Sequence, residues 1–144
     1  MILAALFHDI GHLLAFDGTT KVETMGSYGV QNHGSLGRAF LESCGVPEPI
    51  PALVQSHVDA KRYLVSKYPD YYEKLSPASK ETLKHQGGPM TEDERCEFEK
   101  GSILENALVL RTYDDQAKIP GLELTSLENY KKLLTDYYSE NRQN

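Results

Sequence analysis

Five histidines occur in this 144-residue chain, and four of them are placed where metal or substrate chemistry could use them: His8, His12, His33 and His57. The segment from His8 to His12 is the most informative, because adjacent His and Asp side chains can project from one helical turn toward a common metal. His12 lies one turn further along the same expected helix. A carboxylate at Asp9 could bridge two cations. These residues indicate a metal centre built from imidazole and carboxylate groups.

The available ligand types favour iron or manganese over zinc. Hard or borderline metals such as iron and manganese accept mixed imidazole and carboxylate ligands, whereas thiolate sites prefer zinc. Cys44 and Cys96 have no partner at metal-ligand spacing. Two cysteines also cannot form a disulfide framework, so a reduced, cytoplasmic setting is expected.

Each of these residues taken alone has a structural alternative. A single His on an apolar helix face is more often a hydrogen-bonded core residue than a ligand. Late in the chain, Arg111 and Asp115 have the i,i+4 spacing of a surface ion pair on a solvated helix face. That interpretation suits Asp115 better than Asp114. The histidines taken together are harder to explain as core residues.

Helices are expected to position these groups, and little in the chain predicts a strand, so the predicted fold class is all-α. An apolar helix is predicted over residues 2–15, and a Gly/Thr/Ser-rich loop follows at about residues 17–32. The further predicted helices, bounded by Ser or Thr caps, Gly and Pro, are Gly34–Cys44, Pro51 up to Pro69, Ser76 up to Gly87, one opening at Thr91, Ile103–Lys118 and residues 126–141.

Composition and charge bound the possible functions. Hydrophobic residues make up 40% and charged residues 25% of the chain, ordinary values for a single domain over residues 1–144. Subtracting 21 Asp and Glu from 15 Lys and Arg gives a net charge of −6, which disfavours a nucleic-acid partner. A local Lys and Arg cluster can still bind a small anion. The apolar residues 1–7 are too short to span a bilayer, so no membrane partner is expected.

The ordered set of His8-Asp9, His33, His57 and Asp114 resembles the HD-domain superfamily, and more narrowly its mixed-valent di-iron oxygenases. That group includes inositol oxygenase and the 2-amino-1-hydroxyethylphosphonate oxygenases. The narrower resemblance rests on four blocks, residues 57–64, 76–79, 86–90 and 111–118. It implies an all-α HD-domain helical bundle that lacks the usual N-terminal helix, with a metal-binding core over residues 2–120.

The resemblance also implies a role for each matching residue. His8, Asp9 and Asp114 would hold one iron, and Asp9, His33 and His57 the other, with Asp9 bridging an Fe(II)/Fe(III) pair. His12 and Lys61 match catalytic, substrate-contacting positions. Ser79, Thr82 and Arg111 match positions that bind the phosphonate group of the substrate.

The reaction implied by the resemblance uses dioxygen to cleave the C–P bond of a small α-hydroxyphosphonate, giving phosphate and a carboxylic acid. Two other functions stay open. One is a metal-dependent phosphohydrolase of the wider HD superfamily, in which metal-activated water attacks a phosphate ester. The other is a truncated, non-catalytic relative that serves as an interaction or regulatory module.

Two departures from the family pattern lead to further expectations. The family has another ligand His upstream, and this chain begins seven residues before His8, so the iron of His33 and His57 is expected to fill more readily than the iron of His8 and Asp114. Gly34 stands where an acidic residue commonly follows the ligand His. We therefore expect a less firmly oriented His33 ring.

Overall fold

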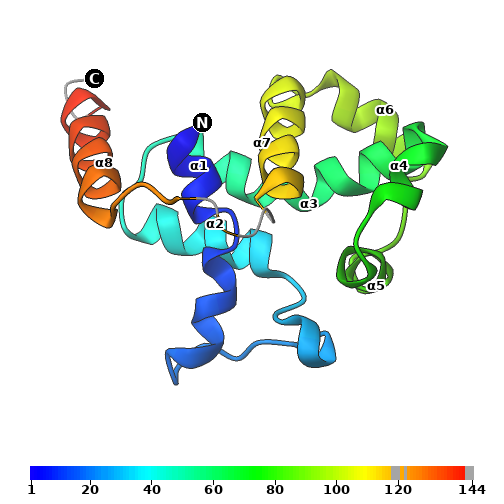
Figure 1. Ribbon diagram of the computed structural model, residues 1–144, viewed down its shortest axis with the longest axis horizontal. Helices are drawn as coiled ribbons and strands as arrows, with labels where there is room; N and C mark the ends of the chain where they lie inside the picture. The colour runs from blue at the N-terminus through cyan, green and yellow to red at the C-terminus, as the bar shows by residue number, and fades with distance from the viewer. Residues whose placement is uncertain (118–120, 122, 142–144) are drawn as a thin grey trace.

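The computed structural model describes residues 1–117, 121 and 123–141, and this part of the chain is all-α, as predicted (Figure 1). Its only strand-like pairing within those ranges is an isolated bridge between Thr24 and Val30. The elements in chain order are α1 (Ile2–Phe7), η1 (Ile10–Phe16), η2 (Gly26–Tyr28), α2 (His33–Ser43), α3 (Ile50–Lys67), α4 (Pro69–Lys74), α5 (Pro77–His85), α6 (Glu92–Lys100), α7 (Leu104–Gln116) and α8 (Leu127–Asn141), where η denotes a 3₁₀ helix.

Helix α3 is the centre of the structure, and α1, α2, α4, α6 and α7 all contact it. Figure 1 shows α8 beside α1 at one end of the molecule and α4, α5 and α6 at the other. The main apolar core lies where α1, α2, α3 and α7 meet. Its buried residues are Leu3, Ala4, Leu41, Val46, Ile50, Leu53, Val54 and Leu110. This core fixes the relative positions of four helices that carry site residues or flank them.

The single helix predicted over residues 2–15 is wrong. The α-helix ends at Phe7, Asp9 leaves helical geometry at φ −102° and ψ 9°, and the chain continues as the 3₁₀ helix η1. Apolar spacing alone does not separate an α-helix from a 3₁₀ helix. Close packing shapes this segment, because a Cβ at Gly11 would lie 1.9 Å from the carbonyl oxygen of His33. The break places the His8-Asp9 pair at a junction between two helices.

The other predicted helices are confirmed, and the expected side-chain caps are present at the starts of α5 and α6. The Ser76 hydroxyl accepts a hydrogen bond from the Ser79 backbone N–H at 3.1 Å at the start of α5. Thr91 and Glu94 form a reciprocal capping box at the start of α6. Helix α4 was not predicted. Lys118, the last residue of one predicted helix, lies outside the described residues.

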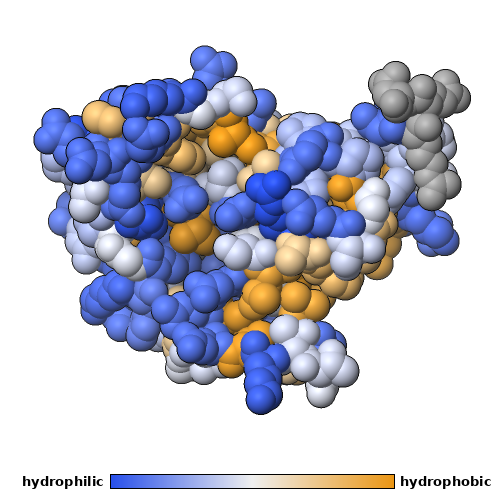
Figure 2. Space-filling view, turned by 180° about the vertical axis from the view of Figure 1, so that it is seen from behind, coloured by the Kyte–Doolittle hydropathy of each residue, from blue (hydrophilic) through white to orange (hydrophobic). Residues whose placement is uncertain are grey.

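The surface is divided in character. Seen from behind, hydrophilic residues cover the end formed by α4, α5 and α6, and apolar residues gather nearer the middle and lower edge (Figure 2). None of the helices in the described ranges is long and apolar enough to cross a membrane. Both cysteines are exposed free thiols.

Candidate metal centre and adjoining cavity

Three side chains from different elements converge on one point. Asp9 comes from the junction after α1, His33 from the first turn of α2, and His57 from the middle of α3. The Nε2 atoms of His33 and His57 lie 3.5 and 3.6 Å from Asp9 Oδ1, and 3.0 Å from each other. One ligand atom of each residue falls within 4.8 Å of the other two, which suits a single metal ion. We call these three residues the inner triad.

The backbone orients both imidazole rings of the inner triad. His33 Nδ1 lies 2.9 Å from the Val30 carbonyl oxygen, and His57 Nδ1 lies 2.6 Å from the Val54 carbonyl oxygen. Because a carbonyl oxygen only accepts, each Nδ1 carries the proton and each Nε2 presents a lone pair. Two nitrogen lone pairs 3.0 Å apart repel each other unless a proton or cation lies between them. The donor set therefore fits a metal cation.

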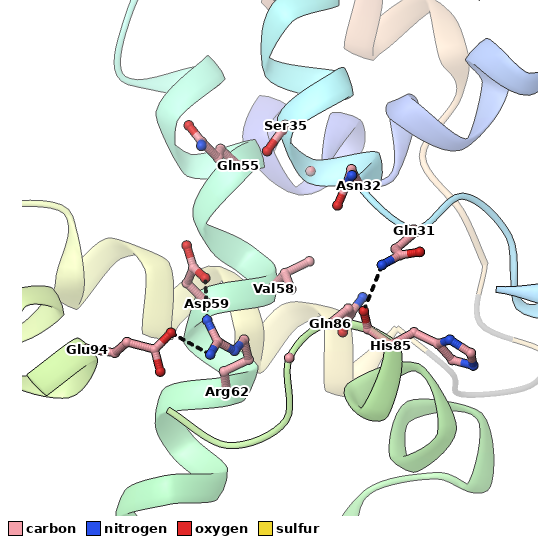
Figure 3. A pocket seen from close by; sticks show the side chains of 12 residues that line it. Gln31, Asn32, Ser35, Gln55, Val58, Asp59, Arg62, His85, Gln86 and Glu94 are labelled. Carbon is pink, nitrogen blue, oxygen red and sulfur yellow. Dashed lines mark hydrogen bonds and ion pairs between the residues drawn. The ribbon is translucent and has the colours of Figure 1, made fainter. Parts of the chain in front are cut away.

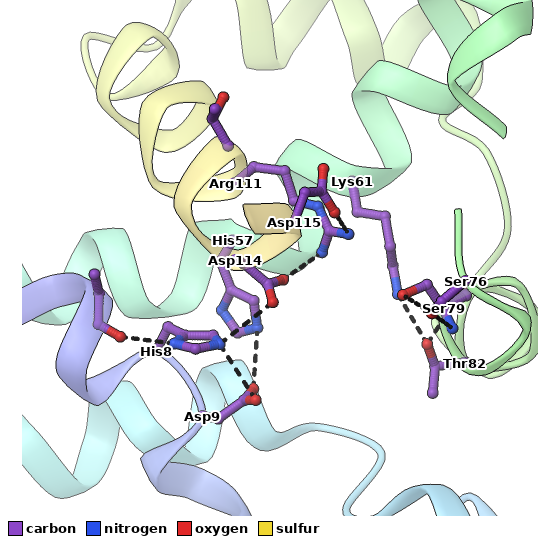
Figure 4. Close-up of polar contacts among 12 residues, drawn as sticks. His8, Asp9, His57, Lys61, Ser76, Ser79, Thr82, Arg111, Asp114 and Asp115 are labelled. Atoms are coloured by element: carbon purple, nitrogen blue, oxygen red, sulfur yellow. Dashed lines mark hydrogen bonds and ion pairs between the residues drawn. The ribbon is translucent and has the colours of Figure 1, made fainter. Parts of the chain in front are cut away.

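A second pair of candidate ligands, His8 and Asp114, lies on the other side of Asp9, and we call it the outer pair. His8 Nε2 lies 3.2 Å from Asp9 Oδ2 and 3.7 Å from Asp114 Oδ1. The His8 ring is oriented in the same way as the others, with Nδ1 2.8 Å from the Ala5 carbonyl oxygen. Asp9 Oδ2 thus faces His8 while Asp9 Oδ1 faces His33 and His57, and Figure 4 shows Asp9 joined to both His8 and His57. This arrangement suits two cations that share one carboxylate.

The inner triad and the outer pair differ in electrostatics. Burial lowers the pKa of His57 to about 4, and the neighbouring His33 ring adds to this effect. Burial also acts to lower the pKa of His8, but the carboxylates of Asp114 and Asp9 outweigh it and raise the value to about 10. Burial acts to raise the pKa of Asp114, but His8 and Arg111 bring it down to about 2. Without a cation, the inner imidazoles are neutral and His8 holds a proton.

His12 has the opposite tautomer from His33 and His57. Its Nδ1 accepts a hydrogen bond from the Val30 backbone N–H at 2.9 Å, so the neutral ring carries its proton on Nε2. That Nε2 lies 3.8 Å from Asp9 Oδ1, and the ring stacks on His33. Burial lowers the pKa of His12 and favours this neutral form. His12 therefore offers a donor to a bound ligand and is poorly suited to hold the metal.

A cavity of about 180 Å³ opens beside the inner triad. It brings together all the predicted metal-ligating, catalytic and substrate-binding residues except His8, which lies behind Asp9 and Asp114. Its lining consists of Asp9, His12, Met25, Tyr28, His33, His57, Val58, Lys61, Ala78, Ser79, Thr82, Gln86, Arg111 and Asp114. A small ligand in this space would contact metal and cationic groups together.

Lys61 and the hydroxyls of α5 form a polar wall of this cavity. Lys61 is only 4% exposed, and its Nζ donates a hydrogen bond to Thr82 Oγ1 at 2.9 Å. Ser79 lies one turn before Thr82, and its hydroxyl accepts a hydrogen bond from Ser76 Oγ at 3.0 Å. Figure 4 shows the Lys61 side chain extending from α3 toward these hydroxyls. Such a wall suits an anion with several oxygen acceptors.

Arg111 is buried at 3% exposure, so the alternative of a solvated surface ion pair is wrong. Its Nη1 donates to Asp114 Oδ2 at 2.6 Å, its Nη2 donates to Asp115, and its Nε donates to the Tyr71 hydroxyl at 2.8 Å. The ion pair with Asp115 is confirmed, and Asp114 takes part as well. Tyr71 was missed, because nothing in the local sequence relates a residue of α4 to one 40 positions later.

The expectation that Gly34 would leave the His33 ring loosely oriented does not match the structure. The Val30 carbonyl oxygen orients that ring at 2.9 Å. Gly34 has a packing role, because a Cβ there would lie 3.0 Å from the Gln55 carbonyl oxygen. Its small size lets α2 approach α3 and brings His33 to His57.

A second, larger cavity of about 390 Å³ adjoins the first (Figure 3). Val58 and Gln86 line both cavities and so form the wall between them. The second cavity is polar. In it the Arg62 guanidinium contacts Glu94 at 2.7 Å and Asp59 at 3.7 Å, and Gln31 Nε2 donates to the His85 carbonyl oxygen at 3.2 Å.

Fold and site together define an all-α protein in which two buried imidazoles and the more exposed carboxylate of Asp9 meet beside a cavity that Lys61 and Arg111 also line. The chain is similar to two phosphonate dioxygenases. It is 38% identical over 136 residues to hydroxymethylphosphonate dioxygenase from Gimesia maris, a match over 90% of this chain and 63% of the relative. It is 39% identical over 124 residues to [1-hydroxy-2-(trimethylamino)ethyl]phosphonate dioxygenase (glycine-betaine-forming) from Leisingera caerulea, over 85% of this chain and 61% of the relative.

A viral protein is similar along the whole chain. An uncharacterized protein of Acanthamoeba polyphaga mimivirus is 42% identical over 144 residues, covering 100% of this chain and 65% of the relative. The chain thus spans less than two thirds of the length of each of these relatives. No protein-family profile matches it.

Proposed function

We propose that this chain carries the active centre of an iron-dependent dioxygenase that cleaves the C–P bond of a small α-hydroxyphosphonate, giving phosphate and a carboxylic acid. One observation carries the proposal: a single cavity of about 180 Å³ joins the metal-ligand set to a buried Lys and Arg. The similarity to two phosphonate dioxygenases supports it.

The proposed cofactor is an Fe(II)/Fe(III) pair of the HD-domain type. His33, His57 and Asp9 would hold one iron, and His8, Asp114 and Asp9 the other. Support comes from the Asp9 carboxylate, whose Oδ1 faces the inner histidines at 3.5 and 3.6 Å and whose Oδ2 faces His8 at 3.2 Å. The bound pair would supply the activation of dioxygen.

The protein's own contribution is binding and orientation of the substrate. Lys61, with the hydroxyls of Ser79 and Thr82, would bind the phosphonate oxygens through charge-assisted and neutral hydrogen bonds. A guanidinium has five N–H groups and Arg111 uses three of them on Tyr71, Asp114 and Asp115, so it can also donate toward the cavity. The Nε2–H of His12 would donate to an oxygen near the metal. Together these contacts would hold the substrate carbon next to the metal centre.

The proposal is tested with the iron-loaded protein and hydroxymethylphosphonate. Atom balance requires one dioxygen consumed for each phosphate released, with formate as the carboxylic acid. We expect oxygen uptake, phosphate and formate in equal amounts, and loss of all three in Asp9→Ala.

Two other outcomes would overturn the proposal. Metal-dependent hydrolysis of a phosphate ester without oxygen uptake would assign the chain to the phosphohydrolases of the wider superfamily. Stoichiometric iron with neither reaction would favour a non-catalytic module.

A further inference from the structure

One buried polar atom near the candidate site has no partner. Among the residues that the structure describes, the side-chain oxygen Gln86 Oε1 is buried and makes no hydrogen bond. Such an acceptor is destabilising until a donor reaches it. Gln86 is the first residue of the block 86–90 that contributes to the family resemblance.

The backbone around Gln86 is held by hydrogen bonds on both sides, which fixes where its side chain starts. The Gln86 N–H donates to the Thr82 carbonyl oxygen at 3.0 Å, which closes the last turn of α5. On one side, Gln31 Nε2 donates to the His85 carbonyl oxygen at 3.2 Å. On the other side, Arg62 Nε donates to the Gly88 carbonyl oxygen at 3.0 Å. Figure 3 shows Gln86 next to the Gln31–His85 contact and beside Val58.

The location of Gln86 relative to Lys61 and Thr82 follows from the hydrogen bond that joins α3 to α5. Lys61 and Thr82 meet across the cavity at 2.9 Å. Val58 lies about one turn before Lys61, and Gln86 about one turn after Thr82, and both line the same cavity. Gln86 is therefore displaced along the cavity wall from Lys61 and Thr82 by about 5 Å, one helical turn.

The chemistry of a carbonyl oxygen limits what it can bind. It only accepts hydrogen bonds, and so do the oxygens of a phosphonate dianion, so Oε1 is not a phosphonate contact. Its partner must be an N–H or O–H group on another part of the ligand. An amine on the carbon next to the hydroxyl-bearing carbon is three covalent bonds from phosphorus, a separation close to one helical turn.

We infer that Gln86 is a specificity-determining residue, whose Oε1 accepts a hydrogen bond from a protonated primary amine on the substituent of a 1-hydroxyphosphonate. This inference rests on the proposed function. Gln86 would favour substrates that carry an N–H donor at this position over those that carry none.

Three probes separate the contributions of charge and hydrogen bonding. Hydroxymethylphosphonate has no substituent, 2-amino-1-hydroxyethylphosphonate has a cation with N–H donors, and 1-hydroxy-2-(trimethylamino)ethylphosphonate has a cation without them. We would measure their affinities by calorimetry with the iron-loaded protein in the absence of oxygen. Gln86→Met keeps the length of the side chain and removes its acceptor. We expect about tenfold weaker binding of the primary amine, and changes below about twofold for the other two probes.

Gln55→Met is the matched control, because Gln55 also lines the second cavity but its Oε1 already accepts from Arg38 at 2.9 Å. We expect Gln55→Met to lower the melting temperature and leave all three affinities unchanged. Gln86→Met should unfold at or above the wild-type temperature, because it removes an unpaired buried acceptor. A clearly lower melting temperature would show that the Gln86 amide has a structural partner and would overturn the inference.

The affinities also distinguish failure of this inference from failure of the proposed function. If Gln86→Met weakens all three probes equally, or none, the specificity role is wrong while hydroxyphosphonate binding stands. If the wild-type protein binds none of the three probes with its iron in place, the proposed function is wrong and the inference falls with it.

Discussion

The inner triad and the outer pair share one carboxylate and one way of orienting imidazole rings, yet they are built differently. His8, His33 and His57 each have Nδ1 bonded to the carbonyl oxygen three residues earlier. The side chains of the inner histidines are 5% and 4% exposed, whereas those of His8 and Asp114 are 19% and 16% exposed. The two inner histidines are thus brought together by the packing of α2 against α3.

The outer pair depends instead on side-chain charges. Asp114 is held by the guanidinium of Arg111 at 2.6 Å, and His8 holds a proton between two carboxylates when no cation is present. A metal entering the outer pair must displace that proton, whereas the inner nitrogens already present lone pairs. The inner triad should therefore be the stronger metal site, and the outer pair the part of the centre more sensitive to substitution and pH.

The largest expected effect is from Asp9→Ala, because Asp9 serves both sets of ligands. We expect loss of nearly all bound iron, measured by elemental analysis after loading and desalting. Asp59→Ala is the control, a carboxylate on α3 that lines the second cavity and contacts Arg62. If Asp9→Ala retained two irons, Asp9 would not bridge them, and the inner triad and the outer pair would not share a carboxylate.

Separate substitutions in the two ligand sets should split the iron content. Asp114→Ala is expected to keep about one iron per chain, held by the inner triad. His57→Ala should lose the inner iron and weaken the outer one, because Asp9 then lacks the partners that position it. Stepwise loading of the wild-type protein should fill the inner triad first. Equal occupancy of both positions at low iron, seen by anomalous scattering, would contradict this order.

Much of the fold could be predicted because its helix ends are local. Ser76, Thr91 and the prolines near α3 and α5 act within a few residues, so sequence spacing is enough to place them. The break at Asp9 was missed because it depends on contact between Gly11 and the carbonyl of His33, a residue 22 positions later. Apolar spacing carries no information on such a contact.

In the candidate site too, local features could be predicted from the sequence and long-range contacts could not. Its candidate ligands were named from the sequence through the resemblance to the HD-domain superfamily, and imidazoles and carboxylates are groups that iron accepts. The surroundings of Arg111 were not, since Tyr71 approaches it from a helix 40 residues away. The unpaired oxygen of Gln86 also could not be predicted, because a missing partner is a property of the packed structure. Residue types indicate the chemistry, and tertiary packing decides which groups stay available.

A smaller effect is expected from Lys61→Met, which removes a cavity cation without touching either set of ligands. A charge-assisted hydrogen bond contributes about 1.5–3 kcal/mol, so affinity for hydroxymethylphosphonate should fall at least about tenfold with iron content unchanged. Lys67→Met, on the outer part of α3, is the control. Arg111→Ala should weaken binding similarly and also lower outer iron, because Asp114 loses its partner. Unchanged affinity in both Lys61→Met and Arg111→Ala would overturn the anion-binding assignment.

The smallest expected effect is on the metal-free protein, where the two ligand sets should respond to pH in opposite directions. His57 has a pKa of about 4 when folded and an ordinary value of 6.5 when unfolded, so the unfolded chain binds more protons between these values. Stability should fall as the pH drops from about 6.5 toward 4. His8 has a folded pKa of about 10, so its contribution is complete below pH 6.5 and is lost as the pH rises toward 10.

Urea unfolding of the chelator-treated protein across this pH range measures how the free energy of unfolding changes with pH on the acid side and on the alkaline side. We expect changes on the order of 1 kcal/mol, which correspond to shifts of a few degrees in melting temperature. His57→Gln should reduce the pH dependence of the free energy of unfolding on the acid side, and His8→Gln should reduce it on the alkaline side. If His8→Gln leaves the alkaline slope as it is in the wild type, the proton is not held between Asp9 and Asp114, and the electrostatic contrast between the inner triad and the outer pair is wrong. If His8→Gln abolishes the alkaline pH dependence, the proton responsible is the one on His8, which iron must displace. Adding iron to the wild-type protein should then release this proton on the alkaline side of neutrality.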